Sequence, residues 1–249
     1  MILCAAPMGI AQEMMLSSGF EKLMRQAEPL APYTWFRVGG PAEYLAEPNN
    51  AEELAALIRR CREQGVEFRL LGSGSNILVP DVGVPGVVIR LSAPAFSEII
   101  VARNVIAVGA GARLGHLIST AAREGLAGLE SLVGIPGTVG GALVGNAGSH
   151  GGDIGQWVTQ ATVMSRGGEL SQLNREQMEF AYRESSLDDA LILSAQFQLE
   201  ADDPAEHAHG QLSGNPLDRV NLPVLGERLI KNLDTQLPNL RLEQGYHRL

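Results

Sequence analysis

Two glycine-rich segments of this chain hold the residues best suited to binding a ligand. The first is Gly72-Ser73-Gly74-Ser75-Asn76, with Ile77 after it, and it directly follows the apolar run 68–71, which we predict to be a buried strand. A turn with so little side chain lets backbone N–H groups close on an anion, and the serine hydroxyls and the asparagine amide can add hydrogen bonds. Gly-Ser runs are also common in ordinary surface turns, so this loop alone leaves both interpretations open.

The second segment runs from residue 134 to residue 142 and combines glycines with apolar residues. Solvated linkers lack such apolar content, and a flat or bulky ligand could approach this backbone closely. Two segments of this kind favour one elongated ligand held at two places, and a dinucleotide fits that description. The residues expected to contribute are Gly134, Ile135, Pro136, Gly137, Thr138, Gly140, Gly141 and Ala142.

The sequence lacks the common nucleotide-binding fingerprints. Ile77 stands where the third glycine of a Gly-x-Gly-x-x-Gly loop would follow Gly72, and Leu114 stands there after Gly109. No Gly-Lys pair occurs, which excludes a P-loop. If the chain binds a nucleotide, it therefore uses another architecture.

Residues 182–185, Tyr-Arg-Glu-Ser, form a third group that could do chemistry. The Arg183 guanidinium could stabilise a developing oxyanion; alternatively, it pairs with a surface carboxylate such as Glu184 or Asp188. The histidines and cysteines show no metal-ligand spacing, so no metal site is predicted. No serine lies in a nucleophile-elbow pattern, which leaves hydrolytic covalent catalysis without support.

The composition is that of a globular protein from a reducing compartment. The 249 residues suffice for one large domain or two small ones. The net charge of −9 argues against nonspecific binding of nucleic acid. Cys4 and Cys61 cannot form a disulfide framework. There is no secretory signal pattern and no apolar run long enough to span a membrane, so we expect a soluble, cytoplasmic protein.

Hydrophobic periodicity predicts the helices and strands that would position these segments. The clearest helix is 50–65, with Asn50 as N-cap, Glu53 at the capping-box position and Gly65 at its end. We further predict strands at 86–91, 105–108, 158–164 and 191–199, a helix at 114–124 and a short helix near 174–180. This order indicates an α+β protein. Changes in composition suggest three parts, 1–92, 93–200 and 201–249.

Together these motifs resemble the UDP-N-acetylenolpyruvoylglucosamine reductases, flavoenzymes also called UDP-N-acetylmuramate dehydrogenases. The resemblance runs from residue 33 to near residue 200. It is carried by the segments 34–44 (Thr-Trp-Phe-Arg-Val-Gly-Gly-Pro-Ala-Glu-Tyr), 71–79, 134–142, 146–148 (Asn-Ala-Gly) and 182–185. It implies the α+β FAD-binding fold of the vanillyl-alcohol-oxidase type, with FAD between the subdomains 1–92 and 93–200.

The resemblance also implies roles for individual residues. The loop from Gly72 to Asn76, with Ile77, would hold the FAD pyrophosphate, and the segment from Gly134 to Ala142, with Asn146, would run along the flavin. In the family, NADPH reduces FAD, and the flavin passes a hydride to the enolpyruvyl double bond of a UDP-linked amino sugar. Arg183 matches the family arginine that stabilises the enolate-like intermediate.

The sequence departs from the family pattern after Leu199. The family has a third domain there, with the serine that donates the proton, whereas residues 201–249 are too few for it and are expected to form a reduced or remnant C-terminal region. Three interpretations follow: an FAD-dependent reductase that uses NADPH in peptidoglycan precursor synthesis, an FAD-binding module with a binding or regulatory role, and a flavin oxidoreductase with another substrate. A protein partner or a second copy of the chain could supply missing groups.

Overall fold

A four-stranded sheet with one helix against it forms the first half of the fold. The computed structural model describes residues 16–149 and 151–201. The strands lie in the order β1 (Met24–Pro29), β2 (Pro41–Ala46), β4 (Val84–Ile89) and β3 (Phe68–Leu70). β2, β4 and β3 are parallel, and β1 is antiparallel to β2. Parallel strands need a crossover connection, and helix α2 (Ala51–Glu63) provides it between β2 and β3.

Helix α2 begins where the sequence predicts it. The Asn50 side chain accepts a hydrogen bond from Glu53 N–H at 2.9 Å, as an N-cap residue should. The Glu53 carboxylate accepts from Asn49 N–H at 2.8 Å rather than from the N-cap N–H, so the predicted capping box closes one residue early. Leu54 and Ile58, on one face of the helix, are fully buried and anchor it to the sheet.

Five antiparallel strands form the second sheet. Their order is β11 (Leu170–Asn174), β10 (Val158–Met164), β14 (Leu191–Gln198), β6 (Val105–Gly109) and β5 (Ile99–Ala102). The strands predicted at 105–108, 158–164 and 191–199 correspond to β6, β10 and β14. One mixed sheet, one antiparallel sheet and separate helices confirm the α+β class.

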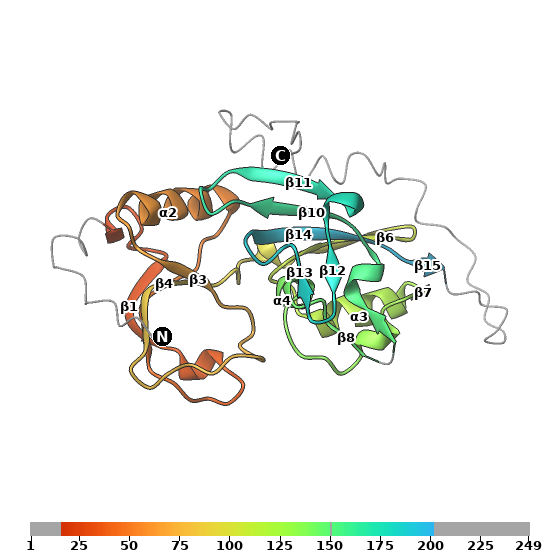
Figure 1. The fold of residues 1–249 in the computed structure, drawn as a ribbon, viewed down its shortest axis with the longest axis horizontal. Helices are drawn as coiled ribbons and strands as arrows, with labels where there is room; N and C mark the ends of the chain where they lie inside the picture. The colour runs from red at the N-terminus through yellow and green to blue at the C-terminus, as the bar shows by residue number, and fades with distance from the viewer. Residues whose placement is uncertain (1–15, 150, 202–249) are drawn as a thin grey trace.

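Helices α3 (Leu114–Arg123) and α4 (Val139–Val144) share one hydrophobic core with the second sheet. Leu117 of α3, Leu143 of α4, and Ile106 and Phe197 of the sheet are fully buried in it. Helix α3 matches the predicted helix 114–124. In Figure 1 both helices lie below the second sheet, and the first sheet and α2 stand beside it at the left.

Helix α2 also contacts the second sheet, which joins the two halves. Met164 and Leu191 of the second sheet belong to the same buried cluster as Leu54 of α2. The turn after β10 comes so close to the helix that a Cβ on Gly168 would lie 3.0 Å from Ala55 O. The two sheets are therefore packed through a continuous apolar contact and not merely tethered.

Short strand pairs and single turns of 3-10 helix complete the described ranges. The strand pairs are β7 (Leu126–Ala127) with β15 (Glu200–Ala201), β8 (Gly148–Ser149) with β9 (Gly152–Asp153), and β12 (Phe180–Ala181) with β13 (Glu184–Ser185). The 3-10 turns are Ala31–Tyr33, Pro94–Phe96, Glu130–Leu132, Ile154–Gln156 and Arg175–Gln177. Within residues 16–149 and 151–201, no helix has the length and hydropathy needed to cross a bilayer.

Two predicted elements differ from the structure. The run 68–71 is not a buried strand, because β3 pairs with β4 alone at the edge of its sheet and leaves Leu70 44% exposed. The helix predicted near 174–180 is only the 3-10 turn Arg175–Gln177, closed by a capping box from Asn174. Nearly all of the C-terminal region 201–249 lies outside the described residues, and the boundary at residue 92 stays a prediction.

Candidate functional site

The two glycine-rich segments, far apart in the sequence, meet in the structure. The Ser75 hydroxyl donates to Pro136 O at 3.3 Å. A Cβ on Gly72 would lie 2.8 Å from Thr138 Oγ1, and a Cβ on Gly137 would lie 3.6 Å from Ser75 Oγ. One site therefore contains both segments, as a single elongated ligand requires.

The first segment turns sharply at the carboxyl end of strand β3. Gly74 has a φ of 65°, in the left-handed region, and a Cβ at this position would collide with Tyr33 O. Trp35 N–H donates to Gly74 O at 3.1 Å. Residues 33–35 therefore support the loop from behind, and only glycine fits at position 74.

The first segment also holds polar groups without partners in the described part of the chain. The backbone N–H groups of residues 72–76 donate no hydrogen bond there, and the Ser73 hydroxyl is buried and unpaired. An unpaired buried polar group costs free energy, so such groups are rare. A phosphate would accept from several of these donors at once. The loop thus fits the pyrophosphate of a dinucleotide.

The second segment is not a loop throughout, because residues 139–144 form helix α4. Gly140 N–H donates to Ala110 O at 2.8 Å, and a Cβ on Gly140 would lie only 3.0 Å from the Ala110 Cβ. This close packing outweighs the low helix propensity of glycine. Gly140 and the buried Ala142 therefore serve packing inside the protein, whereas Gly141 is exposed.

The turn before α4 is the part of the second segment that can reach a ligand. Gly134 and Gly137 have φ values of 82° and 143°, which favour glycine. Thr138 Oγ1 accepts from Gly141 N–H at 3.3 Å and so caps the helix. Ile135 packs against the core of the second half, which fixes the turn to it.

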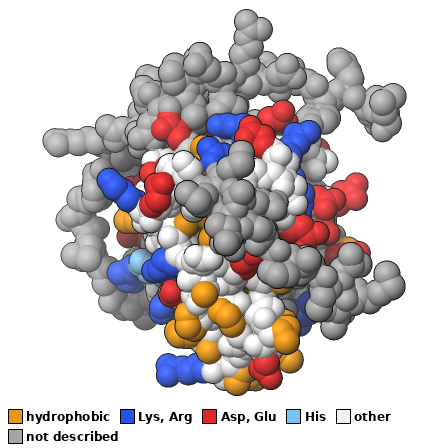
Figure 2. All heavy atoms as spheres, turned by 90° about the vertical axis from the view of Figure 1, so that its left-hand side faces the viewer, with side chains coloured by type: hydrophobic (Ala, Val, Ile, Leu, Met, Phe, Trp, Pro, Cys, Tyr) orange, Lys and Arg blue, Asp and Glu red, His pale blue; other side chains and the backbone are white. Residues whose placement is uncertain are grey.

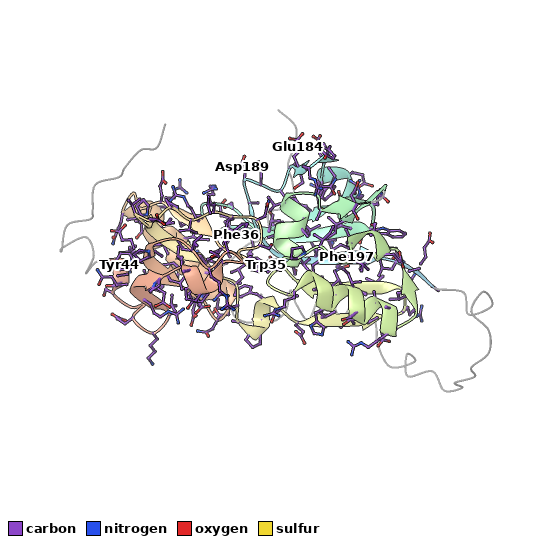
Figure 3. All side chains as sticks on the ribbon, turned by 90° about the horizontal axis from the view of Figure 1, so that it is seen from below. Trp35, Phe36, Tyr44, Glu184, Asp189 and Phe197 are labelled. Carbon is purple, nitrogen blue, oxygen red and sulfur yellow. The ribbon has the colours of Figure 1, made fainter. Side chains whose placement is uncertain are left out.

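Large apolar side chains are exposed beside the first segment. Trp35 and Phe36 are 64% and 69% exposed, and Ile77, Leu78 and Val82 on the neighbouring loop are exposed as well. Figure 2 shows hydrophobic side chains gathered at the lower end of the molecule, where these loops lie in Figure 1. Figure 3 places Trp35 and Phe36 between the two halves. Such a gathering is typical of a surface that contacts a ligand or another protein.

An ionic network that the sequence did not predict fixes the loop between β1 and β2 to its sheet. The Arg90 guanidinium lies 4.4 Å from the centre of the Tyr33 ring. The Glu47 carboxylate pairs with Arg90 at 2.7 Å and with Arg25 at 2.5 Å. Partial burial acts to raise the pKa of Glu47, but the hydrogen bond from Ser92 and the two arginine charges outweigh it, so the pKa is lowered overall.

Arg183 lies at the tip of the hairpin formed by β12 and β13. Its φ of 63° is in the left-handed region, its side chain is exposed, and its guanidinium carbon lies 5.7 Å from the centre of the Tyr182 ring. Among the described residues it forms no ion pair, so the alternative of pairing with Glu184 or Asp188 is not observed. The guanidinium is therefore available to an external anion.

The hairpin is fastened to the carboxyl end of α4. Asn146 Nδ2 donates to Ala181 O at 2.9 Å, and Asn146 Oδ1 accepts from Gly155 N–H at 3.1 Å. The Ser185 hydroxyl donates to Val144 O at 3.0 Å. Asn146, predicted to contact the cofactor, thus directs both amide atoms into the protein. Helix α4 connects the Arg183 hairpin to the glycine-rich turn at its other end.

Comparisons with known proteins agree with this geometry. Residues 42–174 match the family described as FAD binding domain. A UDP-N-acetylenolpyruvoylglucosamine reductase from Rhodopirellula baltica is 41% identical over 181 residues, which cover 73% of this chain and 59% of that protein. The crystal structure of the reductase from Thermus caldophilus is 31% identical, with a TM-score of 0.60, and the match covers 82% of this chain and 79% of that one. The chain belongs to the UDP-N-acetylenolpyruvoylglucosamine reductase family.

Membership in the reductase family confirms the resemblance found in the sequence and FAD as the cofactor of this domain. A chitooligosaccharide oxidase shares the fold at a TM-score of 0.55 and 17% identity, over 77% of this chain and 43% of that one, consistent with the vanillyl-alcohol-oxidase type. The chain spans 59% of the length of the Rhodopirellula baltica reductase.

The structure separates the residues predicted to bind FAD into two groups. Residues 72–76 and the turn 134–138 face one another with unpaired or exposed groups, and their contact with FAD stays a prediction. Gly140, Ala142 and Asn146 have their contacts inside the protein. Residues 33–35 and Ser185 support the site but were not predicted as site residues. The contacts of Tyr33 and Trp35 with Gly74, and of Ser185 with Val144, become visible only in the folded chain.

Proposed function

We propose that the chain binds FAD between its two glycine-rich segments and forms the FAD-binding part of a reductase. This reductase would use NADPH to reduce UDP-N-acetylenolpyruvoylglucosamine, a UDP-linked amino sugar, in peptidoglycan precursor synthesis. The observation that carries the proposal is the contact between the segments, made by Ser75 and Pro136 beside the unpaired donors of residues 72–76.

Protein groups would hold FAD at two places. Residues 72–76, followed by Ile77, would bind the pyrophosphate through backbone N–H groups and the Ser73 hydroxyl. The turn 134–138 and Gly141 would lie along the flavin, because Gly134 and Gly141 are exposed and a Cβ on Gly134 would meet no atom within 4 Å. Bound FAD supplies the hydride chemistry, and the protein orients it and excludes competing reactions.

Arg183 would stabilise the negative charge that develops on the sugar's enolpyruvyl group. A guanidinium stays charged at all working pH values and offers donors in a fixed geometry, and an oxyanion needs such preorganised donors. In the family, the serine that donates the proton belongs to the third domain, and this proposal names no proton donor in the present chain. The same proposal includes two FAD-binding subdomains, residues 1–92 and 93–200. It also includes a cytoplasmic location for the protein.

The experiment is NADPH oxidation by the FAD-loaded full chain, measured with and without the UDP-enolpyruvyl sugar. Oxidation should depend on the sugar. Arg183→Ala should lower kcat by roughly 10²- to 10³-fold, the usual effect of removing an oxyanion donor, while bound FAD stays unchanged. Arg123→Ala, on the exposed side of α3, is the matched control and should keep wild-type turnover. Equal turnover in the wild type and Arg183→Ala would contradict the role given to Arg183.

A second candidate is an FAD-binding module with a binding or regulatory role, completed by a protein partner or a second copy of the chain. The exposed Trp35, Phe36 and Leu78 beside the site favour it, because a further domain or chain would bury them. In that case the purified protein would contain FAD but show no sugar-dependent NADPH oxidation. A flavin oxidoreductase with another substrate would instead reoxidise its reduced flavin with that substrate alone.

A further inference from the structure

Two separate backbone segments meet on the buried side chain of Asn146. The residue has a φ of 38°, which asparagine tolerates better than most side chains, and it is 6% exposed. Its amide donates to Ala181 O in the hairpin at 2.9 Å and accepts from Gly155 N–H at 3.1 Å. A carboxylate at this position could accept but not donate, so the pair of contacts requires an amide.

Ser185 makes a second attachment between the hairpin and α4. It is 9% exposed, and its hydroxyl donates to Val144 O at 3.0 Å and accepts from Leu187 N–H at 3.3 Å. Val144 is the last residue of α4, where helix carbonyls have no partner within the helix. One hydroxyl therefore completes the helix end and fixes strand β13 to it.

Side-chain packing also holds the base of the hairpin in place. A Cβ on Gly155 would lie 2.5 Å from Phe180 Cγ, so the ring rests directly on that backbone. The Arg175 guanidinium carbon lies 5.3 Å from the centre of the same ring. At the tip, by contrast, Tyr182 is 89% exposed and Arg183 is exposed too. A rigid base thus presents an open tip.

We infer that Asn146 and Ser185 are positioning residues that hold Arg183 at a fixed place relative to the nucleotide-binding loop. Helix α4 transmits the position, because Thr138 at its start faces Gly72 and Val144 at its end receives Ser185. A displacement of about 1 Å of a catalytic group can cost about 10²-fold in rate. The expected effect on the reaction rate rests on the proposed function. The hydrogen bonds by which Asn146 and Ser185 attach the hairpin to α4 do not depend on it.

The attachment is tested by amide hydrogen exchange in the FAD-loaded full chain. Asn146→Gly removes the amide but suits the left-handed backbone, and Ser185→Ala removes the hydroxyl. Both should speed exchange of the Ser186 amide, which donates to Glu179 O at 2.9 Å, by about tenfold or more. Ser185→Thr, which keeps a hydroxyl, should restore most of the protection. The control variant is Ser119→Ala, at an exposed position of α3. In it the Ser186 amide should exchange at the wild-type rate.

The positioning role is tested by the two half-reactions. Reduction of bound FAD by NADPH should keep its wild-type rate in Asn146→Gly and Ser185→Ala, because Arg183 acts on the sugar. Reoxidation by the UDP-enolpyruvyl sugar should slow by about tenfold or more. Equal slowing of both half-reactions, or unchanged hydrogen exchange, would overturn the inference. If the wild type does not turn over this sugar, the proposed function fails, and the exchange result alone still decides whether the attachment holds.

Discussion

Replacing Ser73 by alanine should change stability and cofactor affinity in opposite directions. The Ser73 hydroxyl is buried and has no partner among the described residues. A buried polar group left unpaired costs about 1–3 kcal/mol, and replacing it by an apolar group removes that cost. We therefore expect Ser73→Ala to raise the free energy of unfolding of the FAD-free protein by about 1 kcal/mol, the lower end of that range.

The same substitution should weaken FAD binding. A hydrogen bond to a charged group such as a phosphate contributes about 1.5–3 kcal/mol, which corresponds to a dissociation constant raised by about 10- to 150-fold. The matched control is Ser75→Ala in the same loop. The Ser75 hydroxyl already donates to Pro136 O at 3.3 Å, so its removal should lower stability by about 0.5–1.5 kcal/mol.

Urea unfolding of the FAD-free variants measures the first effect, and titration with FAD followed by flavin fluorescence measures the second. The reasoning is refuted if Ser73→Ala lowers the free energy of unfolding and leaves the dissociation constant of FAD unchanged. That outcome would mean that the Ser73 hydroxyl serves the folded protein and not the cofactor.

Two other substitutions test the site and the core. Gly74→Ala should lower the free energy of unfolding by about 2 kcal/mol or more, because it adds a collision with Tyr33 O to the strain of a left-handed φ. Gly65→Ala, with a φ of 64° and nothing within 4 Å, should cost only about 1 kcal/mol in urea unfolding, and equal losses would contradict this explanation. Burial raises the pKa of the Cys61 thiol to about 11, so in a Cys4→Ser background maleimide should label it only on unfolding. Because the unfolded thiol ionises first, stability should fall as the pH rises from about 9 towards 11, more than in Cys61→Val.

Much of the fold could be predicted from the sequence because the signals that specify it are local. Asn50 caps α2 through an N–H three residues away, and the helix buries the face that its apolar spacing marks. The strands β6, β10 and β14 alternate or run apolar as buried strands do. The glycine-rich loop 72–76 could be identified as a binding candidate for the same reason, since glycine and serine have their special properties in any context.

Local sequence signals were enough to identify helices α2 and α3, strands β6, β10 and β14, and the loop 72–76 with its donors for an anion, but not helix α4 or the edge position of β3. The contacts of those segments depend on the tertiary fold. Ser75 meets Pro136 across 61 positions of sequence, and Asn146 meets Ala181 across 35, so local spacing predicts neither contact. Local spacing also does not predict that Gly140 lies in a helix. Its N–H donates to Ala110 O, at the end of a strand that is distant in the sequence. Burial and long-range hydrogen bonds depend on the packing of the whole chain, and they override local propensity wherever the two disagree.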